Sequence, residues 1–369
     1  MIWFLVGICA VAFGYQLVAI LASLRQLLRR DPVPTRFPAI SILKPVRGRD
    51  PEFYEAIRSH AVQDYPGEVE ILFGVADVND PAIEDFERLR VEFPSLTLRM
   101  VHATTSAPNG KVGVLQDLAR RARHEIWLVN DSDIRVPQGY LRQVVAPLED
   151  PGVGVVTCLY RATAATFPGR FEALGIVTDF APSTLEAPMV GINEFGLGST
   201  LVFRRADLEA VGGFAALADY IADDYQLANR ITGQLGRRVH LSKTVVETRL
   251  GEETWAGIWH HQVRWHRTIR VSRGAYVGLP VTNATLWALI ALCSGAWWLA
   301  APLMAARISM ALVAGWRVLR SPLAVRLAPL IPLRDLWGFA VWVVGLVGSS
   351  VRWRGKLLRL RPDGRIARY

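Results

Sequence analysis

The first 24 residues, Met1 to Leu24, contain no charged side chain, and the first charge is Arg25. An α-helix of this length, at about 1.5 Å per residue, is long enough to cross a hydrocarbon core about 30 Å thick. A cleaved signal peptide fits poorly, because no basic segment precedes the run and no small-residue cleavage site closes it. We therefore expect residues 1–24 to form a transmembrane anchor.

A second apolar zone lies near the C-terminus, in a chain that is 51% hydrophobic overall. Gly274–Ala306 and Leu336–Val351 carry no charge and contain tryptophans of the kind found at membrane interfaces. Several arginines separate the two runs, so the stretch between them could be a further helix, a re-entrant segment or a surface helix. We assign residues 280–351 to C-terminal membrane segments and leave the number of spans open.

Positive charge is concentrated beside these apolar runs, in a chain with a net charge of +9. Arg25, Arg29 and Arg30 follow the first run, and residues 352–369 hold seven Lys/Arg and one acid. Basic flanks are retained on the cytoplasmic side, which places residues 25 to about 275 and the basic tail 352–369 there. No nucleic-acid recognition motif appears, so the charge is expected to meet anionic lipid headgroups.

Between the membrane segments, a proline-rich linker (residues 25–38) precedes alternating apolar strands and amphipathic helices. The expected strands are Ala39–Leu43, Glu70–Ala76, Leu96–Val101, Ile126–Val129 and Val153–Cys158. The expected helices are Pro51–Gln63, Pro81–Phe93, Lys111–Arg123 and Pro137–Leu148. This alternation predicts an α/β domain with a mostly parallel sheet over residues 39–252. No G-x-G-x-x-G or P-loop motif follows a strand, which argues against dinucleotide and P-loop chemistry.

Carboxylates at strand ends are the main chemical signal, because ligands of parallel sheets bind beyond the carboxyl ends of the strands. The strand Ile126–Val129 leads directly into Asp131 and Asp133, a D-x-D pair that suits a divalent ion bridging a diphosphate. The alternative is an Asx turn or a helix cap. Asp77 closes an earlier strand, where it could contact the base or ribose of a nucleotide or simply form a turn.

A third acidic element, Asp223-Asp224, opens a helix-like stretch that reaches Arg230. Acids favour helix N-termini for dipole reasons alone. Two adjacent carboxylates also disfavour joint ionisation, which would help one of them to act as a general base.

Residues 253–279 form a tryptophan-rich segment with helical spacing, which we interpret as an interfacial amphipathic helix. Trp255, Trp259 and Val263 fall on one face, whereas Arg264, Arg267 and Arg270 are three residues apart. His260 and His261 are adjacent on the helix and cannot easily share a metal ion, so Arg264 is the better catalytic candidate, as a cation facing the diphosphate.

Taken in order, these motifs resemble the family 2-type nucleotide-sugar glycosyltransferases, and specifically the ceramide glucosyltransferase group, family 21. The resemblance runs from about Ser41 to Arg270. It includes Ser41-Ile-Leu-Lys-Pro45, Gly74-Val-Ala-Asp77, Asn109-Gly-Lys111, Asn130-Asp-Ser-Asp-Ile-Arg-Val136, Gly198-Ser-Thr, Ala218-Asp-Tyr-Ile-Ala-Asp-Asp-Tyr225 and Arg264-Trp265.

The resemblance implies a GT-A fold, a UDP-sugar donor, a divalent metal (Mg²⁺ or Mn²⁺) and inversion at the anomeric carbon. It also implies a role for each matching residue: Asp77 near the uridine, Asp131 and Asp133 at the metal and diphosphate, Asp224 as general base, and Lys44, Pro45 and Lys111 in the donor pocket. Arg264 and Trp265 match the end of the (Q/R)-x-x-R-W motif, but His261 stands where the family has Gln or Arg. A protonated His261 could serve there, or the contact could be absent.

The acceptor implied by the resemblance is a membrane lipid, with the enzyme in a bacterial inner membrane. Transfer of glucose from UDP-glucose to ceramide is the first expectation, and transfer of N-acetylglucosamine to a hopanoid such as bacteriohopanetetrol is the alternative, since a bacterial branch carries similar motifs. A processive polysaccharide synthase and an inactive scaffold are further alternatives.

Overall fold

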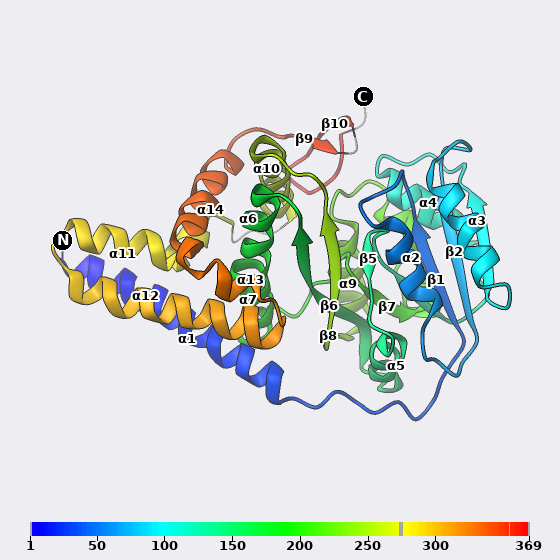
Figure 1. Cartoon of the computed structure of the whole chain (residues 1–369), viewed down its shortest axis with the longest axis horizontal. Helices are drawn as coiled ribbons and strands as arrows, with labels where there is room; N and C mark the ends of the chain where they lie inside the picture. Colours follow the sequence, from blue (N-terminus) through cyan, green and yellow to red (C-terminus); the bar gives the residue numbers. More distant parts are fainter. Residues whose placement is uncertain (1, 273–275, 354, 368–369) are drawn as a thin grey trace. The chain divides into compact units, whose positions relative to one another are not determined.

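The computed structural model describes residues 2–272, 276–353 and 355–367, which form two compact units (Figure 1). The sheet unit comprises Arg30–Tyr160, Asn193–Arg249 and Arg365–Tyr369. The helical unit comprises Met1–Arg29, Arg161–Ile192 and Leu250–Gly364. Parts of the expected membrane segments and of the basic tail lie outside the described residues: Met1, Gly274, Arg354, Arg368 and Tyr369.

The sheet unit contains an eight-stranded sheet in the order β3-β2-β1-β4-β7-β6-β8-β5. Its strands are β1 (Ile40–Pro45), β2 (Val69–Val75), β3 (Thr97–His102), β4 (Ile126–Val129), β5 (Ile134–Arg135), β6 (Val153–Ala164), β7 (Leu201–Arg204) and β8 (Arg238–Leu250). The run β3-β2-β1-β4 is parallel, with Leu43 opposite both Leu72 and Val129. Strands β7, β6, β8 and β5 add antiparallel pairs. The expected α/β architecture and the parallel strands at its centre are confirmed.

Both faces of this sheet are buried, which explains why its strands appear in the sequence as continuous apolar runs. Side chains alternate between the faces, so Ile40 and Ile42 of β1 enter one core while Leu43 enters the other. The first core is closed by α2, α3 and α5, and the second by α4, α8 and α9. These helices are α2 (Phe53–Ala61), α3 (Ala82–Glu92), α4 (Gly110–Ala119), α5 (Tyr140–Val145), α8 (Arg205–Ala210) and α9 (Asp223–Leu235), with short 3₁₀ turns at Ala146–Glu149 and Phe214–Leu217.

The helical unit holds the candidate membrane spans. Within the described residues, Ile2–Leu28 (α1) and Trp297–Val318 are long and apolar enough to cross a bilayer. A bent pair, Tyr276–Thr282 and Ala284–Cys293 (α11), would make a third if it acts as one span. The expected anchor is therefore confirmed as a helix of suitable length, and a candidate span also exists near the C-terminus.

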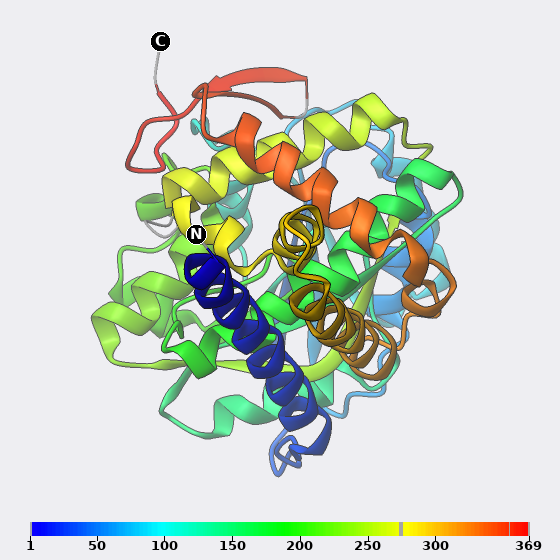
Figure 2. The same ribbon diagram turned by 90° about the vertical axis from the view of Figure 1, so that its left-hand side faces the viewer.

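Helices α1, α11 and α12 (Trp297–Leu312) lie side by side in the helical unit (Figures 1 and 2). Their shared surface is rich in alanine, including Ala12, Ala288 and Ala300. Small side chains allow the helix backbones to approach closely. Helices in a bilayer often associate in this way, because the hydrophobic effect does not drive them together in lipid. Large apolar side chains such as Trp3 and Trp297 stay exposed, at 83% and 68%. An apolar outer surface of this kind suits a bilayer better than water.

The rest of the helical unit consists of shorter elements, of which α6, α10 and α14 pack together. The helices are α6 (Phe167–Gly175), α7 (Ala181–Glu186), α10 (Trp255–Ser272), α13 (Leu323–Arg326) and α14 (Ile331–Gly345), with π-helical turns at Ile176–Phe180 and Val313–Val318, 3₁₀ turns at Ala187–Val190 and Ala328–Leu330, and a hairpin of β9 (Ser350–Trp353) and β10 (Lys356–Arg359). Helix α14 covers most of the uncharged run Leu336–Val351. At 15 residues it is shorter than the roughly 20 that a span needs.

Candidate active site

The D-x-D turn follows β4 directly, as the sequence predicts. The side chain of a buried lysine, Lys44, donates hydrogen bonds to this turn. Lys44 on β1 donates from Nζ to Asn130 Oδ1 (2.8 Å) and to the carbonyl oxygen of Asp131 (3.2 Å). Burial lowers the pKa of Lys44 to about 7, against the opposing effect of Asp133 and Asp131. Since the Lys44 side chain is fully buried, its contacts in the structure are with the turn itself.

Lys111, at the start of α4, joins two of the predicted acids. Its Nζ lies 2.8 Å from Asp131 Oδ1 and 3.3 Å from Asp223 Oδ2. Burial lowers the pKa of Lys111, but the neighbouring carboxylates outweigh that effect and hold the pKa above its ordinary value. Asn109 caps the same helix and donates from Nδ2 to Asp223 Oδ1 at 3.2 Å. Both carboxylate oxygens of Asp223 thus have a partner, Lys111 for Oδ2 and Asn109 for Oδ1.

Asp224, the predicted base, is held by Gly198 instead. The Gly198 N–H donates to Asp224 Oδ2 at 2.9 Å, and its carbonyl accepts from the Asp131 N–H at 3.1 Å. A Cβ on Gly198 would lie 2.9 Å from Asp131 Oδ2 and 3.5 Å from Asp224 Oδ2. The two carboxylates therefore converge over a position that only glycine leaves open. Burial and the adjacent Asp223 raise the pKa of Asp224 to about 6.

The Asp133 side chain contacts the sheet. Its Oδ2 accepts a hydrogen bond from the Thr248 hydroxyl on β8. Burial and the charge of Asp131 raise the pKa of Asp133 to about 6. By contrast, the Asp131 side chain is 44% exposed. The D-x-D pair therefore presents one accessible carboxylate and one that is held against β8.

Pro45 ends β1, and Asp77 lies two residues beyond the end of the neighbouring strand β2. Asp77 is exposed, and its Oδ1 accepts from the Asn79 N–H at 2.9 Å, which is an Asx turn. Pro45 is half-buried. Asp77 thus adopts the geometry of the turn alternative and still leaves carboxylate oxygen accessible at the carboxyl edge.

The residues fit a divalent cation that is bound in part by substrate phosphates. Mg²⁺ commonly takes one or two protein carboxylates and completes its shell with phosphate oxygens and water. Asp131 offers such a carboxylate, with Asp133 and Asp224 close by. Among the described residues no three His, Cys, Asp or Glu side chains cluster as a complete metal site.

The predicted motif residues of the helical unit lie on α10. His261 contacts the buried Glu172 of α6, with Nδ1 2.7 Å from Oε1, and its ring centroid lies 4.5 Å from that of Trp265. Arg264 is half-buried on the same helix. Glu172 was not predicted from the sequence, because it lies 89 residues from His261 and no local pattern connects them.

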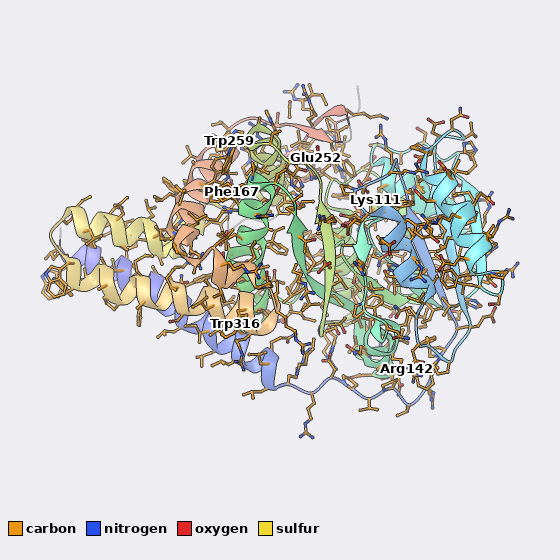
Figure 3. The ribbon with its side chains drawn as sticks, viewed as in Figure 1. Lys111, Arg142, Phe167, Glu252, Trp259 and Trp316 are labelled. Carbon is orange, nitrogen blue, oxygen red and sulfur yellow. The ribbon has the colours of Figure 1, made fainter. Side chains whose placement is uncertain are left out.

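The predicted amphipathic helix exists, but its aromatic side packs against protein. Trp255 and Trp259 contact Trp337 of α14, with ring centroids 5.7 and 5.2 Å away. Figure 3 shows Trp259 on α10 and Phe167 on α6 of this unit, with Lys111 on α4 of the sheet unit. Arg267 donates from Nε to the carbonyl of Val347 at 3.2 Å, just beyond the end of α14. This arginine thus satisfies a backbone carbonyl near a helix end.

Curated relatives of the chain are ceramide glucosyltransferases. It is 25% identical over 229 residues to ceramide glucosyltransferase 1 of Caenorhabditis elegans, covering 61% of this chain and 48% of the relative. It is 30% identical over 152 residues to the ceramide glucosyltransferase of Komagataella phaffii, covering 40% and 29%. The matched regions therefore span less than half the length of these relatives.

Among solved structures, a mannosyltransferase from Pyrobaculum calidifontis in complex with GDP-Man and Mn²⁺ matches 93% of this chain and 96% of its own, with a TM-score of 0.57 and 21% identity. This likeness supports the expected GT-A fold. The family model described as glycosyl transferase family 21 matches residues 4–366. The chain belongs to glycosyl transferase family 21.

Proposed function

We propose that the protein is a membrane-bound inverting glycosyltransferase that transfers a hexose from a UDP-sugar to the hydroxyl of a membrane lipid. Transfer of glucose from UDP-glucose to ceramide is the form that its curated relatives support. The lipid acceptor agrees with the two candidate spans of the helical unit.

The convergence of Asp131 and Asp224 over Gly198 carries this proposal. One carboxylate is accessible and ion-paired with Lys111, whereas the other has a raised pKa and a fixed orientation. Inverting transfer needs a base for the acceptor and a charged environment for the diphosphate. The position of Asp131 and Asp224 beside Gly198 supports the proposal that they meet these two needs.

In the proposed reaction, Asp224 accepts the proton of the lipid hydroxyl while that oxygen attacks the anomeric carbon. The new glycosidic bond forms as the bond between the anomeric carbon and the diphosphate oxygen breaks, and UDP leaves with the electron pair. Lys111 stabilises the Asp131 carboxylate and favours negative charge near it. Pro45 and Asp77 complete the donor pocket near the ends of β1 and β2, and the buried Lys44 shapes it by holding the Asn130–Asp131 turn.

A divalent metal, Mg²⁺ or Mn²⁺, would be held by Asp131 and Asp133 together with phosphate oxygens. When bound, it would neutralise charge that builds on the leaving diphosphate. Asp133 would keep acceptor sites for this role, because the Thr248 hydroxyl donates to its Oδ2 and a carboxylate offers about four lone-pair sites.

His261, Arg264 and Trp265 are proposed to act in the same reaction, with Arg264 as a cation for the diphosphate. Basic flanks support a topology with residues 25 to about 275 on the cytoplasmic side of a bacterial inner membrane.

Purified protein, UDP-glucose with Mg²⁺ or Mn²⁺, and ceramide in mixed micelles test the proposal by mass spectrometry of the lipid product. Glucosylceramide is expected. Parallel reactions with UDP-N-acetylglucosamine and bacteriohopanetetrol test the alternative acceptor, and sizing of water-soluble product tests for a polymer. UDP binding without any glycolipid across these donors and acceptors would overturn the proposal and favour a scaffold.

A further inference from the structure

A buried arginine within the helical unit is only partly satisfied by the protein. Arg307 lies in the candidate span Trp297–Val318, and its Nε and Nη2 donate to the carboxylate of Asp335 at 2.9 and 2.6 Å. The side chain is 4% exposed, and its third nitrogen, Nη1, has no hydrogen-bond partner among the residues that the structure describes. A buried N–H group without an acceptor costs free energy, so each one calls for an explanation.

A second buried arginine, Arg334 on α14, has the same property. It is 8% exposed, and its Nε also lacks a partner within the described part of the chain. Its guanidinium lies against Gly175, the last residue of α6, where a Cβ would overlap it. Arg334 and Arg307 interact electrostatically with each other. Because burying two like charges together is unfavourable, nearby carboxylates are needed to offset them.

Asp179, four residues beyond Gly175, supplies an accessible carboxylate beside these arginines. It interacts electrostatically with Arg334 and Arg307. Asp179 is exposed, and its carboxylate accepts no hydrogen bond from any residue that the structure describes. It belongs to the π-helical turn Ile176–Phe180, an irregularity that is frequent at functional sites. Asp179 therefore offers an acceptor close to two unfilled donors.

The π-helical turn that carries Asp179 packs directly against the candidate spans. A Cβ on Gly315 of the span Trp297–Val318 would lie 3.1 Å from the Val177 carbonyl oxygen, so the turn and this span approach closely. The turn continues into α7, which packs on α1. Tyr15 of α1 also interacts electrostatically with Asp179. Ionisable side chains among candidate spans are a functional-site hypothesis by default, and a lipid is the ligand that this location favours.

The charge balance of the cluster indicates what kind of lipid headgroup would fit. The carboxylates that interact with Arg307 and Arg334 are those of Asp179, Asp335 and Glu172. Acids thus already outnumber the two arginines, and an anionic phosphate would add to that excess. A neutral headgroup adds no charge. A hydroxyl group both donates and accepts, so it can donate to a carboxylate and accept from a guanidinium N–H.

We propose that Asp179, Arg307 and Arg334 bind the neutral polar headgroup of a membrane lipid through its hydroxyl or amide groups. Asp179 accepts a hydrogen bond from the headgroup, and the unfilled Nη1 of Arg307 and Nε of Arg334 donate to its oxygens. This inference rests on the proposed function, because it takes the bound lipid to be the acceptor. It gives the helical unit a part in selecting that lipid as well as in anchoring the enzyme.

Lipid binding, measured separately from transfer, tests the inference. The full chain is reconstituted in phosphatidylcholine nanodiscs, and native mass spectrometry measures the binding of ceramide, bacteriohopanetetrol and phosphatidylglycerol. The site variants are Asp179→Ala and Arg334→Met. Glu252→Ala and Arg317→Met are the matched controls, because Glu252 and Arg317 are exposed residues of the same unit that lose the same charges.

The wild type is expected to bind ceramide or bacteriohopanetetrol in preference to phosphatidylglycerol, and the preferred lipid identifies the source of the headgroup. Each site variant should weaken that binding at least about tenfold, as expected for a lost hydrogen bond to a charged group. The controls should stay within about twofold of the wild type. The inference would be overturned by preferential binding of phosphatidylglycerol, by no binding of either neutral lipid, or by equal affinities of Asp179→Ala and Glu252→Ala.

Steady-state kinetics separate this inference from the proposed function. In an active enzyme, Asp179→Ala should raise the KM for the lipid about tenfold and leave the KM for the UDP-sugar within about twofold. An unchanged lipid KM would overturn the inference and leave the proposed function standing. Absence of transfer, with neutral-lipid binding that still depends on Asp179, would do the reverse. If Arg334→Met does not fold, as judged by thermal unfolding, Asp179→Ala decides, because an exposed side chain can be removed without leaving a cavity.

Discussion

The backbone of Gly198 holds Asp224 directly, with its N–H donating to Asp224 Oδ2 at 2.9 Å. The same residue accepts a hydrogen bond from the Asp131 N–H, so one peptide segment sets the positions of both carboxylates. The φ of Gly198 lies outside the left-handed region, and the requirement for glycine is therefore one of space rather than of backbone conformation.

Gly198→Ala should lower kcat about 100-fold, because its Cβ would lie 2.9 Å from Asp131 Oδ2 and displace the carboxylates. Thermal unfolding should change little, since alanine can adopt this backbone. Gly233→Ala is the control on α9, the helix that carries Asp224, where a Cβ meets nothing within 4 Å. It should keep the wild-type rate and add up to about 1 kcal/mol of helix stability. Equal rates for the two variants would contradict the proposed role of Gly198.

Asp224→Asn should lower kcat by about 10²- to 10⁴-fold, which is the usual contribution of a general base. UDP binding, measured by calorimetry, should remain close to that of the wild type. Asp223→Asn should cost about tenfold or less, because Asp223 is bound by Lys111 and Asn109 and has a supporting role. A variant of Asp223 that is as inactive as Asp224→Asn would reverse the assignment of the base.

The strands that lead to these acids could be predicted because they are buried on both faces. Ile126–Val129 was predicted with the bounds that β4 has, and Asp131 and Asp224 lie where a strand end and a helix start predict them. The antiparallel strands β7 and β8 were not predicted, and neither was the grouping of residues 161–192 with the helical unit. These features depend on pairings between distant parts of the chain, and such pairings produce no local periodic pattern in the sequence. The contacts of Asp133 with Thr248 and of His261 with Glu172 are of the same kind.

The acid limb of the pH–rate profile should report Asp224. Burial and Asp223 raise its pKa to about 6, and a base acts only when it is ionised. The value of kcat/KM should therefore rise with pH through about 6 and fall about tenfold per unit below it. Asp223→Asn removes a neighbouring negative charge, so it should move the limb to lower pH. Asp223 is not among the groups that raise the pKa of Asp133. If the acid limb stays at the same pH in Asp223→Asn, the limb therefore reports Asp133 rather than Asp224.

Arg307 and Asp335 form a buried ion pair in the helical unit, and breaking it should destabilise that unit. Arg307 lies within the candidate span Trp297–Val318 and makes two hydrogen bonds to the carboxylate, at 2.9 and 2.6 Å. The side chains are 4% and 7% exposed. Asp335→Leu alone leaves a buried cation without its partner, which should cost about 3–5 kcal/mol.

Because two apolar residues restore charge balance, Arg307→Met with Asp335→Leu should recover most of that loss. The measurement is the thermal unfolding midpoint in detergent micelles, with Arg317→Met as the control. Arg317 is exposed on the same candidate span, so its replacement should leave the midpoint within a few degrees of the wild type. A double variant that is less stable than Asp335→Leu would show that the pair contributes more than charge balance. An ionisable residue in a candidate span is a functional-site hypothesis by default, and glycosyl transfer by the recovered double variant would then test whether Arg307 and Asp335 serve the acceptor lipid as well as the fold.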